Sequence, residues 1–195
     1  MKKLFIWTFV VGVVLGAAVM AWGYISFKGN AVLESKEFYV SRNTTYDELI
    51  DSLKPSIKHH FAFDIYAERL ALKENYKVGH YVVKDGMNVI EIVRMFKLGL
   101  QTPVKVTMNN VKIPAQLAGK LSKQFEADSA EFVQVLTDKA LAKKLGFDNP
   151  LTMFSIFIPN TYEFYWTATP EEFVDRMYKE YKRFWTAERD AKRKR

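Results

Sequence analysis

Residues 4–27 contain no charged side chain, and this uncharged stretch limits what the chain can fold into more than any other feature. Lys2 and Lys3 precede it and Lys28 follows it. A helix of this length rises about 36 Å, which is enough to cross a hydrocarbon core of about 30 Å with some tilt. The lysines before the stretch favour a cytoplasmic N-terminus. We therefore expect residues 1–28 to form a cytoplasmic start and one transmembrane anchor, with the rest of the chain outside the cytoplasm.

The alternative is a cleaved signal peptide, for which Val19-Met20-Ala21 is an acceptable cleavage site. The apolar core of a signal peptide is usually about 7–15 residues long, and residues 4–27 exceed that length. The retained anchor is therefore the favoured interpretation.

The composition indicates a folded chain that does not bind nucleic acid. Hydrophobic residues make up 49% of the sequence, and the absence of cysteine excludes disulfides and cysteine-ligated metals. The first two lysines and residues 189–195 supply six of the seven net positive charges, which leaves about +1 for residues 28–188. A nearly neutral domain lacks the basic surface that binding to DNA or RNA requires.

The histidines do not form a metal-ligand pattern. His59 and His60 are adjacent, so they cannot share one helix face, and His80 stands alone. We expect neither a metal nor another cofactor.

A unit of strand, polar turn and short amphipathic helix occurs in residues 38–53 and again, 43 positions later, in residues 81–96. β-branched and aromatic residues form the strand, and apolar residues then recur at helical spacing. A looser third copy covers residues 106–121, with a turn at Asn109 and Asn110. The pattern predicts two related strand-helix units and a divergent third one.

Both full copies begin their helix with a capping box. Thr45 and Asn88 are good N-cap residues, and Glu48 and Glu91 stand three positions later. In a capping box the glutamate side chain bonds back to the N-cap backbone, so these glutamates have a structural role. We therefore assign no catalytic role to either one.

Most of the remaining sequence has helical spacing of its apolar residues. Residues 59–76 are expected to form one helix, and its apolar positions are Phe61, Ile65, Leu70 and Leu72. Capping boxes at residues 128–131 and 169–172 open two further helices, and Gly146 ends a helix that lies between them. The last helix has an apolar stripe of the kind that faces a core: Phe173, Met177, Tyr181 and Phe184.

Residues 155–166 fit neither the helical nor the strand period well. An apolar run ends at Pro159, and polar side chains then alternate with aromatic ones. Aromatic faces beside amide, hydroxyl and carboxylate groups suit a sugar site, because pyranose rings have apolar faces and hydroxyl edges. The alternative is an ordinary turn that closes a small core, and the chemistry of the residues does not decide between the two.

Beside the anchor and the strand-helix repeats, three segments are distinctive: Gly79-His80-Tyr81-Val82-Val83, Val104-Lys105-Val106-Thr107-Met108 and, most specifically, Phe157-Ile158-Pro159-Asn160-Thr161-Tyr162-Glu163-Phe164. With these features the whole chain resembles the endolytic murein transglycosylase family (MltG, or YceG-like). Members of that family combine an N-terminal anchor with strand-helix repeats and a signature of Phe or Ile, Pro, Asp or Asn, Thr and Tyr.

The resemblance implies an α+β fold in three parts: the anchor in residues 1–28, LysM-like strand-helix units in residues 29–102, and the beginning of a mixed α/β catalytic domain in residues 103–195. It implies a single-pass protein of the inner membrane whose bulk is periplasmic or otherwise extracytoplasmic. Members cut nascent peptidoglycan strands between N-acetylmuramic acid and N-acetylglucosamine, leave 1,6-anhydro ends and so terminate elongation. One carboxylate acts first as acid and then as base, unlike the carboxylate pair of most glycosidases.

The substrate-binding residues that the resemblance implies are Asn160, Thr161, Tyr162 and Glu163. Phe154 and Ser155 depart from the pattern, because the family often has Glu-Gly at this place. The family's catalytic glutamate lies in an Ala-Ser-Ile-Val-Glu-like helix well after the signature, and this sequence reaches Arg195 before any such segment. We therefore expect no catalytic residue within this chain, and no glycan cleavage by it. The chain is then either a piece of a longer enzyme, with the catalytic residue after Arg195, or an inactive product.

Two other functions fit the repeats. A membrane-tethered, LysM-like module could bind peptidoglycan without chemistry. A scaffold that holds cell-wall synthases through its anchor is the third alternative.

Overall fold

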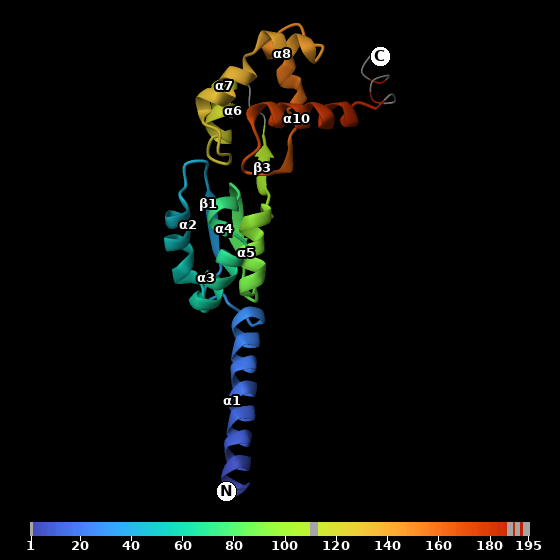
Figure 1. Ribbon diagram of the computed structural model, residues 1–195. Coiled ribbons are helices and arrows are strands. Elements are labelled where there is room, and N and C mark those ends of the chain that lie inside the picture. Colours follow the sequence, from blue (N-terminus) through green and yellow to red (C-terminus); the bar gives the residue numbers. More distant parts are fainter. Residues whose placement is uncertain (1, 110–112, 187–188, 190–191, 193–195) are drawn as a thin grey trace. The chain divides into compact units, whose positions relative to one another are not determined.

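The computed structural model describes residues 2–109, 113–186, 189 and 192, and the chain divides into two compact units (Figure 1). Unit 1 is Met1–Thr102 and unit 2 is Pro103–Arg195. Each unit has its own hydrophobic core and its own two-stranded antiparallel sheet, together with short helices. The expected α+β class is therefore confirmed.

Unit 1 begins with the long helix α1, Lys2–Lys28. Its segment Ile6–Lys28 is long and apolar enough to cross a membrane, and its most apolar part is not buried against the rest of the chain. The long apolar helix expected from the sequence is therefore present.

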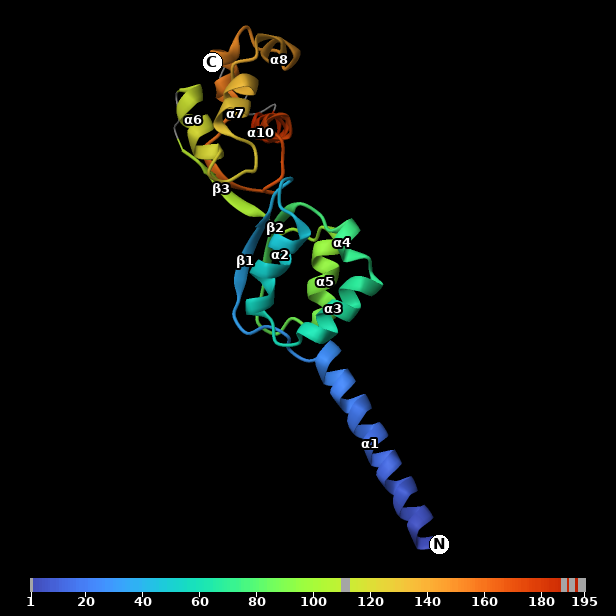
Figure 2. The same cartoon turned by 60° about the vertical axis from the view of Figure 1, so that its left-hand side comes forward.

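The sheet of unit 1 pairs β1 (Lys36–Val40) with β2 (Gly79–Val83), and Phe38 lies opposite Tyr81. Along β1 the side chains alternate, so that Phe38 and Val40 are buried while Glu37 and Tyr39 are exposed. The other elements of this unit, which Figure 2 shows from a second side, are α2 (Tyr46–Leu53), η1 (Lys54–Ser56), α3 (His60–Arg69), α4 (Leu72–Asn75) and α5 (Val89–Leu98).

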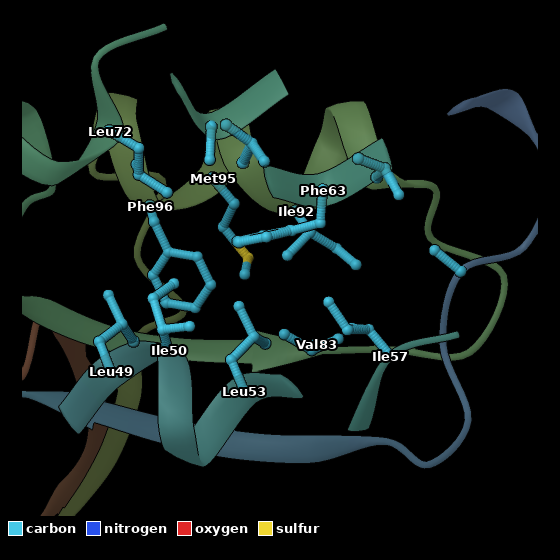
Figure 3. Packing of buried hydrophobic residues seen from close by; sticks show 14 of the residues in the cluster. Leu49, Ile50, Leu53, Ile57, Phe63, Leu72, Val83, Ile92, Met95 and Phe96 are labelled. Carbon is cyan, nitrogen blue, oxygen red and sulfur yellow. The ribbon is translucent and has the colours of Figure 1, made fainter. Parts of the chain in front are cut away.

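The core of unit 1 is built jointly by the two copies of the repeat. Leu49 and Leu53 of α2, from the first copy, point toward Ile92 and Phe96 of α5, from the second (Figure 3). All four side chains are at most 2% exposed. Neither copy therefore has a core of its own, and the two fold as one unit.

Both predicted capping boxes are present. The Thr45 hydroxyl accepts from the Glu48 amide and the Glu48 carboxylate accepts from the Thr45 amide, at 3.3 and 2.8 Å. Asn88 and Glu91 repeat this arrangement at 3.0 and 2.9 Å. The two glutamates thus occupy the same local setting, as the repeat predicted.

The single helix predicted for residues 59–76 is wrong. α3 ends at Arg69 and α4 begins at Leu72, because Ala71 adopts the left-handed conformation with φ 48°, through which an α-helix cannot continue. The side chain of Asn75 donates to the Ala71 carbonyl at 2.8 Å and holds this break. The buried positions of α3 are Ala62, Phe63 and Ala67, not the predicted Phe61 and Ile65.

Unit 2 pairs β3 (Val104–Met108) with β4 (Asn160–Phe164) in its sheet. Phe173 is the centre of its core, since four other rings lie within 6 Å of the Phe173 ring; they belong to Phe125, Phe132, Phe157 and Phe164. The helices of this unit are α6 (Pro114–Leu121), α7 (Ser129–Leu136), α8 (Lys139–Lys144), α9 (Pro150–Met153), η2 (Phe154–Ile156) and α10 (Pro170–Phe184).

The helix ends predicted for unit 2 are confirmed. Asp128 and Glu131 form a capping box at α7, and Thr169 and Glu172 form one at α10. Gly146 follows α8 with φ 87°, a conformation that glycine adopts without strain. The predicted stripe of α10 is buried at Phe173 and Met177, while Tyr181 is partly buried and Phe184 is exposed.

The third copy of the repeat keeps its strand and helix but not the sheet or the cap of the other two. β3 pairs with β4, and α6 starts at Pro114 after Ile113, whose side chain makes no capping bond. The predicted turn falls partly on Asn110, which lies outside the described residues, as does most of the basic run 189–195.

Candidate functional site

The four predicted site residues, 160–163, lie in the regular strand β4 (Asn160–Phe164), while the part of the signature before them, 157–159, is irregular and follows η2. β4 runs antiparallel to β3, with Glu163 opposite Lys105 and Thr161 opposite Thr107. Because side chains of a strand alternate between two faces, the four predicted residues do not share one surface. Thr161 and Glu163 lie on one face of the sheet, and Asn160 and Tyr162 lie on the other.

The first face is polar and open to solvent. Lys105, Thr107, Thr161 and Glu163 are all exposed, and the two threonine hydroxyls lie 3.0 Å apart. Tyr165, the next residue after β4, is also exposed. We call Lys105, Thr107, Thr161 and Glu163 the ribbon face. Two hydroxyls, an ammonium group and a carboxylate, beside an exposed aromatic ring, can donate to and accept from the hydroxyl edges of a sugar.

The opposite face joins β4 to the core and to a small hollow. Tyr162 is buried, and its hydroxyl donates to the Ile158 carbonyl at 3.0 Å. Burial raises the pKa of Tyr162, and the Glu180 carboxylate raises it further, while Arg176 acts in the opposite direction. The hollow has a volume of about 240 Å³, and it is lined by Ile158, Asn160, Tyr162, Glu180, Arg183, Phe184 and Arg189.

Guanidinium groups dominate the charge of this hollow. The Glu180 carboxylate accepts from Arg176 at 3.0 Å and from Arg183 at 3.1 Å. The Arg189 guanidinium lies over the Phe184 ring and donates to the Phe184 carbonyl at 2.8 Å. The hollow itself is lined by two guanidinium groups, Arg183 and Arg189, and by one carboxylate, Glu180, which leaves a positive balance. Such a hollow suits a negatively charged or hydroxyl-rich group.

Neither Glu163 nor Glu180 has the setting of a general acid. Glu163 is exposed on the ribbon face, and Glu180 is held by two guanidinium groups. A general acid of a glycosidase usually lies in an apolar pocket that favours its protonated form. Neither of these two carboxylates therefore has the surroundings that favour a protonated general acid.

Comparison with known proteins supports the family suggested by the signature. Residues 38–195 match the family model described as "YceG-like family". The chain belongs to the YceG-like family. A search of curated proteins finds no match.

Among solved structures, this YceG-like chain is similar to the crystal structure of a yceG-like protein from Listeria monocytogenes. The two share 18% sequence identity, with a TM-score of 0.42, and the match covers 83% of this chain and 59% of the Listeria chain. The YceG-like chain described here thus spans about three fifths of the length of that protein.

Within this YceG-like chain, the sequence pointed to β4 but missed the residues that surround it. Lys105 and Thr107 come from a strand more than 50 positions earlier, and only the pairing of β3 with β4 brings them alongside. Arg183 lies in the last turn of α10 and Arg189 comes after this helix, and basic residues at a helix end have many ordinary explanations. The alternation of polar and aromatic residues in β4 was the one available signal, and it correctly separates exposed from buried side chains.

Unit 1 has a groove of its own. The groove has a volume of about 860 Å³ and runs along α5 and the turn before it. Its walls combine charged and apolar side chains, namely Lys84, Asp85, Gly86, Met87, Glu91, Arg94, Met95, Leu98 and Leu100.

The possible metal ligands among the described residues do not form a cluster. No group of three or more His, Asp or Glu side chains with metal-binding geometry occurs in the described part of the chain. His60 contacts the Lys54 and Ile57 carbonyls through Nε2, and His80 stacks on Tyr39 and bonds to the Thr102 carbonyl through Nδ1. Both rings therefore have structural partners.

Proposed function

We propose that this chain is the anchored, glycan-contacting part of an endolytic murein transglycosylase. The observation that carries the proposal is the match of residues 38–195 to the YceG-like family. The segment that resembles the family signature, residues 157–164, includes β4. In this proposal α1 crosses the inner membrane with its N-terminus in the cytoplasm, and both units face the nascent peptidoglycan outside. Unit 1 corresponds to the LysM-like part and unit 2 to the start of the catalytic domain.

The reaction needs a carboxylic acid that protonates the glycosidic oxygen and then, as carboxylate, takes the proton from the C6 hydroxyl while that oxygen attacks C1. Such a reaction leaves a 1,6-anhydro end and needs no attacking water. We propose that Asn160, Thr161, Tyr162 and Glu163 help to bind or shape the site for the strand, and that the acid comes from outside residues 1–195. The surroundings of Glu163 and Glu180 support this division of roles.

The test uses the full chain in detergent micelles, mixed with purified peptidoglycan. We expect the chain to co-sediment with peptidoglycan without releasing 1,6-anhydro products, as measured by mass spectrometry. The double variant Thr161→Ala with Glu163→Gln should weaken co-sedimentation. Glu171→Gln, an exposed change in the same unit, should not. Anhydro products that form with the native chain and vanish in Glu163→Gln would instead make Glu163 the acid.

A second candidate function is a membrane-tethered binding module without chemistry, and the groove beside α5 favours it. Its mixture of Arg94, Glu91 and apolar walls could hold a glycan against unit 1. Under this alternative, Arg94→Ala should reduce co-sedimentation with peptidoglycan and the ribbon-face variant should not. The opposite result favours the transglycosylase.

A further inference from the structure

α3 has apolar side chains on two of its faces. Ala62, Phe63 and Ala67 are buried in the core of unit 1. Phe61 and Ile65 lie one turn apart on the other side, and they are 65% and 43% exposed. A helix on the surface of a soluble domain needs one apolar face, and a second exposed apolar face indicates a further contact.

The start of α3 lies beside the end of α1. The rings of Phe61 and Trp22 are 6.3 Å apart, and those of Tyr66 and Phe27 are 6.5 Å apart. Both pairs are separated by 39 positions in the sequence, so the two helices run alongside each other in the same direction here. Both views show α3 close to this end of α1 (Figures 1 and 2). If α1 crosses a membrane, the depth of a residue on α1 therefore gives the depth of its neighbour on α3.

Trp22 lies near the outer end of the apolar span. It lies six residues before Lys28, which is about 9 Å along the helix. The segment Ile6–Lys28 is about 35 Å long and exceeds a hydrocarbon core of about 30 Å by roughly one turn. Tryptophan and tyrosine are enriched at the membrane boundary, and Trp22 and Tyr24 are both exposed at this level. Phe61, in contact with Trp22, lies at the same level.

We propose that unit 1 rests on the outer surface of the bilayer through α3, with Phe61 and Ile65 in the interfacial layer of the lipid. This inference rests on the proposed membrane span of α1. Phe61, beside Trp22, lies deeper than Ile65, which is one turn nearer to Tyr66 and the outer end of α1. The apolar surface of Phe61 and Ile65 that stays exposed within unit 1 is thereby covered by lipid.

Charge at this end of unit 1 suits a lipid surface. Lys28 and Lys58 are exposed, and the Lys58 amide donates to the Ala31 carbonyl at 2.7 Å, directly after α1. Both ammonium groups thus lie close to the point where the chain leaves the span, where anionic headgroups attract them. A span with this second contact fixes the tilt of unit 1 on the membrane, which a flexible tether would not do.

The experiment uses the full chain in nanodiscs of phosphatidylethanolamine and phosphatidylglycerol. Because the chain has no cysteine, single cysteines can carry a nitroxide at positions 14, 61, 65 and 98. Power-saturation electron paramagnetic resonance compares the access of oxygen, which partitions into lipid, with that of a water-soluble nickel chelate. Leu98→Cys is the matched control, since Leu98 is 62% exposed and ends α5. The opposite end of α5 is the one near α1, because the Met87 carbonyl, two residues before α5, accepts from the Ala31 amide.

We expect the oxygen-to-nickel access ratio to decrease in the order Val14→Cys, Phe61→Cys, Ile65→Cys and Leu98→Cys, with labels 61 and 65 several-fold above label 98. Equal ratios at 61, 65 and 98, with label 14 in lipid, overturn this inference and leave the proposed span intact. If the label at position 14 is instead accessible to the nickel chelate, as in water, both the proposed span of α1 and the lipid contact of α3 are wrong. Low access of both reagents at 61, with dipolar broadening between labels, overturns the lipid contact in favour of a second copy of the chain.

Discussion

Phe38 lies directly opposite Tyr81 in the β1–β2 ladder, and the two residues are also equivalent positions of the 43-residue repeat. In an antiparallel pair, equivalent positions can face each other at one point, which is a local two-fold axis. Both rings then pack on Phe96, with ring centroids 6.1 and 4.8 Å away. The two copies of the repeat are therefore halves of one sheet and one core, which predicts that damage to either half destabilises all of unit 1.

Loss of either N-cap should destabilise unit 1 to a similar degree. Thr45→Ala and Asn88→Ala each remove the side-chain acceptor of a capping box, and we expect the free energy of unfolding to fall by about 0.5–2 kcal/mol. Urea unfolding followed by circular dichroism measures it. Thr45→Ser and Asn88→Asp keep an acceptor and serve as controls. A large loss in one half and none in the other would contradict the symmetric arrangement.

Tyr81 should make unit 1 sensitive to alkali. Burial raises the pKa of Tyr81 from 10.0 to about 12, so the folded chain keeps a proton that the unfolded chain releases near pH 10. This contribution to stability is present below pH 10 and is lost as the pH rises towards 12. Tyr81→Phe should remove that dependence, which denaturant midpoints between pH 9 and 12 can measure.

Tyr81→Phe should also destabilise unit 1 at neutral pH. The Tyr81 hydroxyl donates to the Lys77 carbonyl at 2.8 Å, so Tyr81→Phe should lower the free energy of unfolding by about 0.5–1.5 kcal/mol at pH 7. Tyr165→Phe, at an exposed position, is the control. If Tyr81→Phe and the native chain lose stability in parallel above pH 10, the proposed role of this phenol is wrong.

Phe173 should be the most sensitive position of unit 2 among its core rings. Phe173→Ala removes a ring that contacts four others, and we expect a loss of about 3–5 kcal/mol in the free energy of unfolding. Phe184→Ala, at a partly exposed position of the same helix, should change it by less than about 0.5 kcal/mol. The fluorescence of Trp166 and Trp185 during unfolding reports on this unit. Equal losses in both variants would contradict the assigned core.

Local signals in the sequence predicted the elements of this fold well. Capping residues such as Thr45 and Asn88 act on the next few backbone amides, so their effect can be deduced from spacing. The face of α3 could not be deduced in this way, since Phe61 and Phe63 are both apolar and the rest of the fold decides which one is buried. The break at Ala71 was equally hidden, because no glycine marks it.

The candidate site depends on long-range pairing, and the sequence predicted it less completely. The four residues of the signature were found from their chemistry and from the family resemblance. Their separation into two faces follows from β4 being a strand, and Thr107 reaches Thr161 through a ladder between segments 54 positions apart. Such a pairing leaves no mark in the spacing of a single sequence.

Tyr162 and Asn160, which lie on the same face of β4, should separate stability from glycan binding, because Tyr162 is buried and Asn160 is exposed. Tyr162→Phe removes the donor to the Ile158 carbonyl, so it should lower the free energy of unfolding by about 0.5–1.5 kcal/mol and leave peptidoglycan co-sedimentation unchanged at temperatures where the chain is folded. Asn160→Ala should weaken peptidoglycan co-sedimentation and leave the free energy of unfolding nearly unchanged. Asn160 is exposed, and its side chain accepts from the neighbouring Thr161 amide without reaching the core. Urea unfolding and co-sedimentation, measured on the same preparations, give both quantities. Weaker co-sedimentation by Tyr162→Phe with unchanged unfolding would show that the hydroxyl contacts the glycan and that its bond to Ile158 is dispensable.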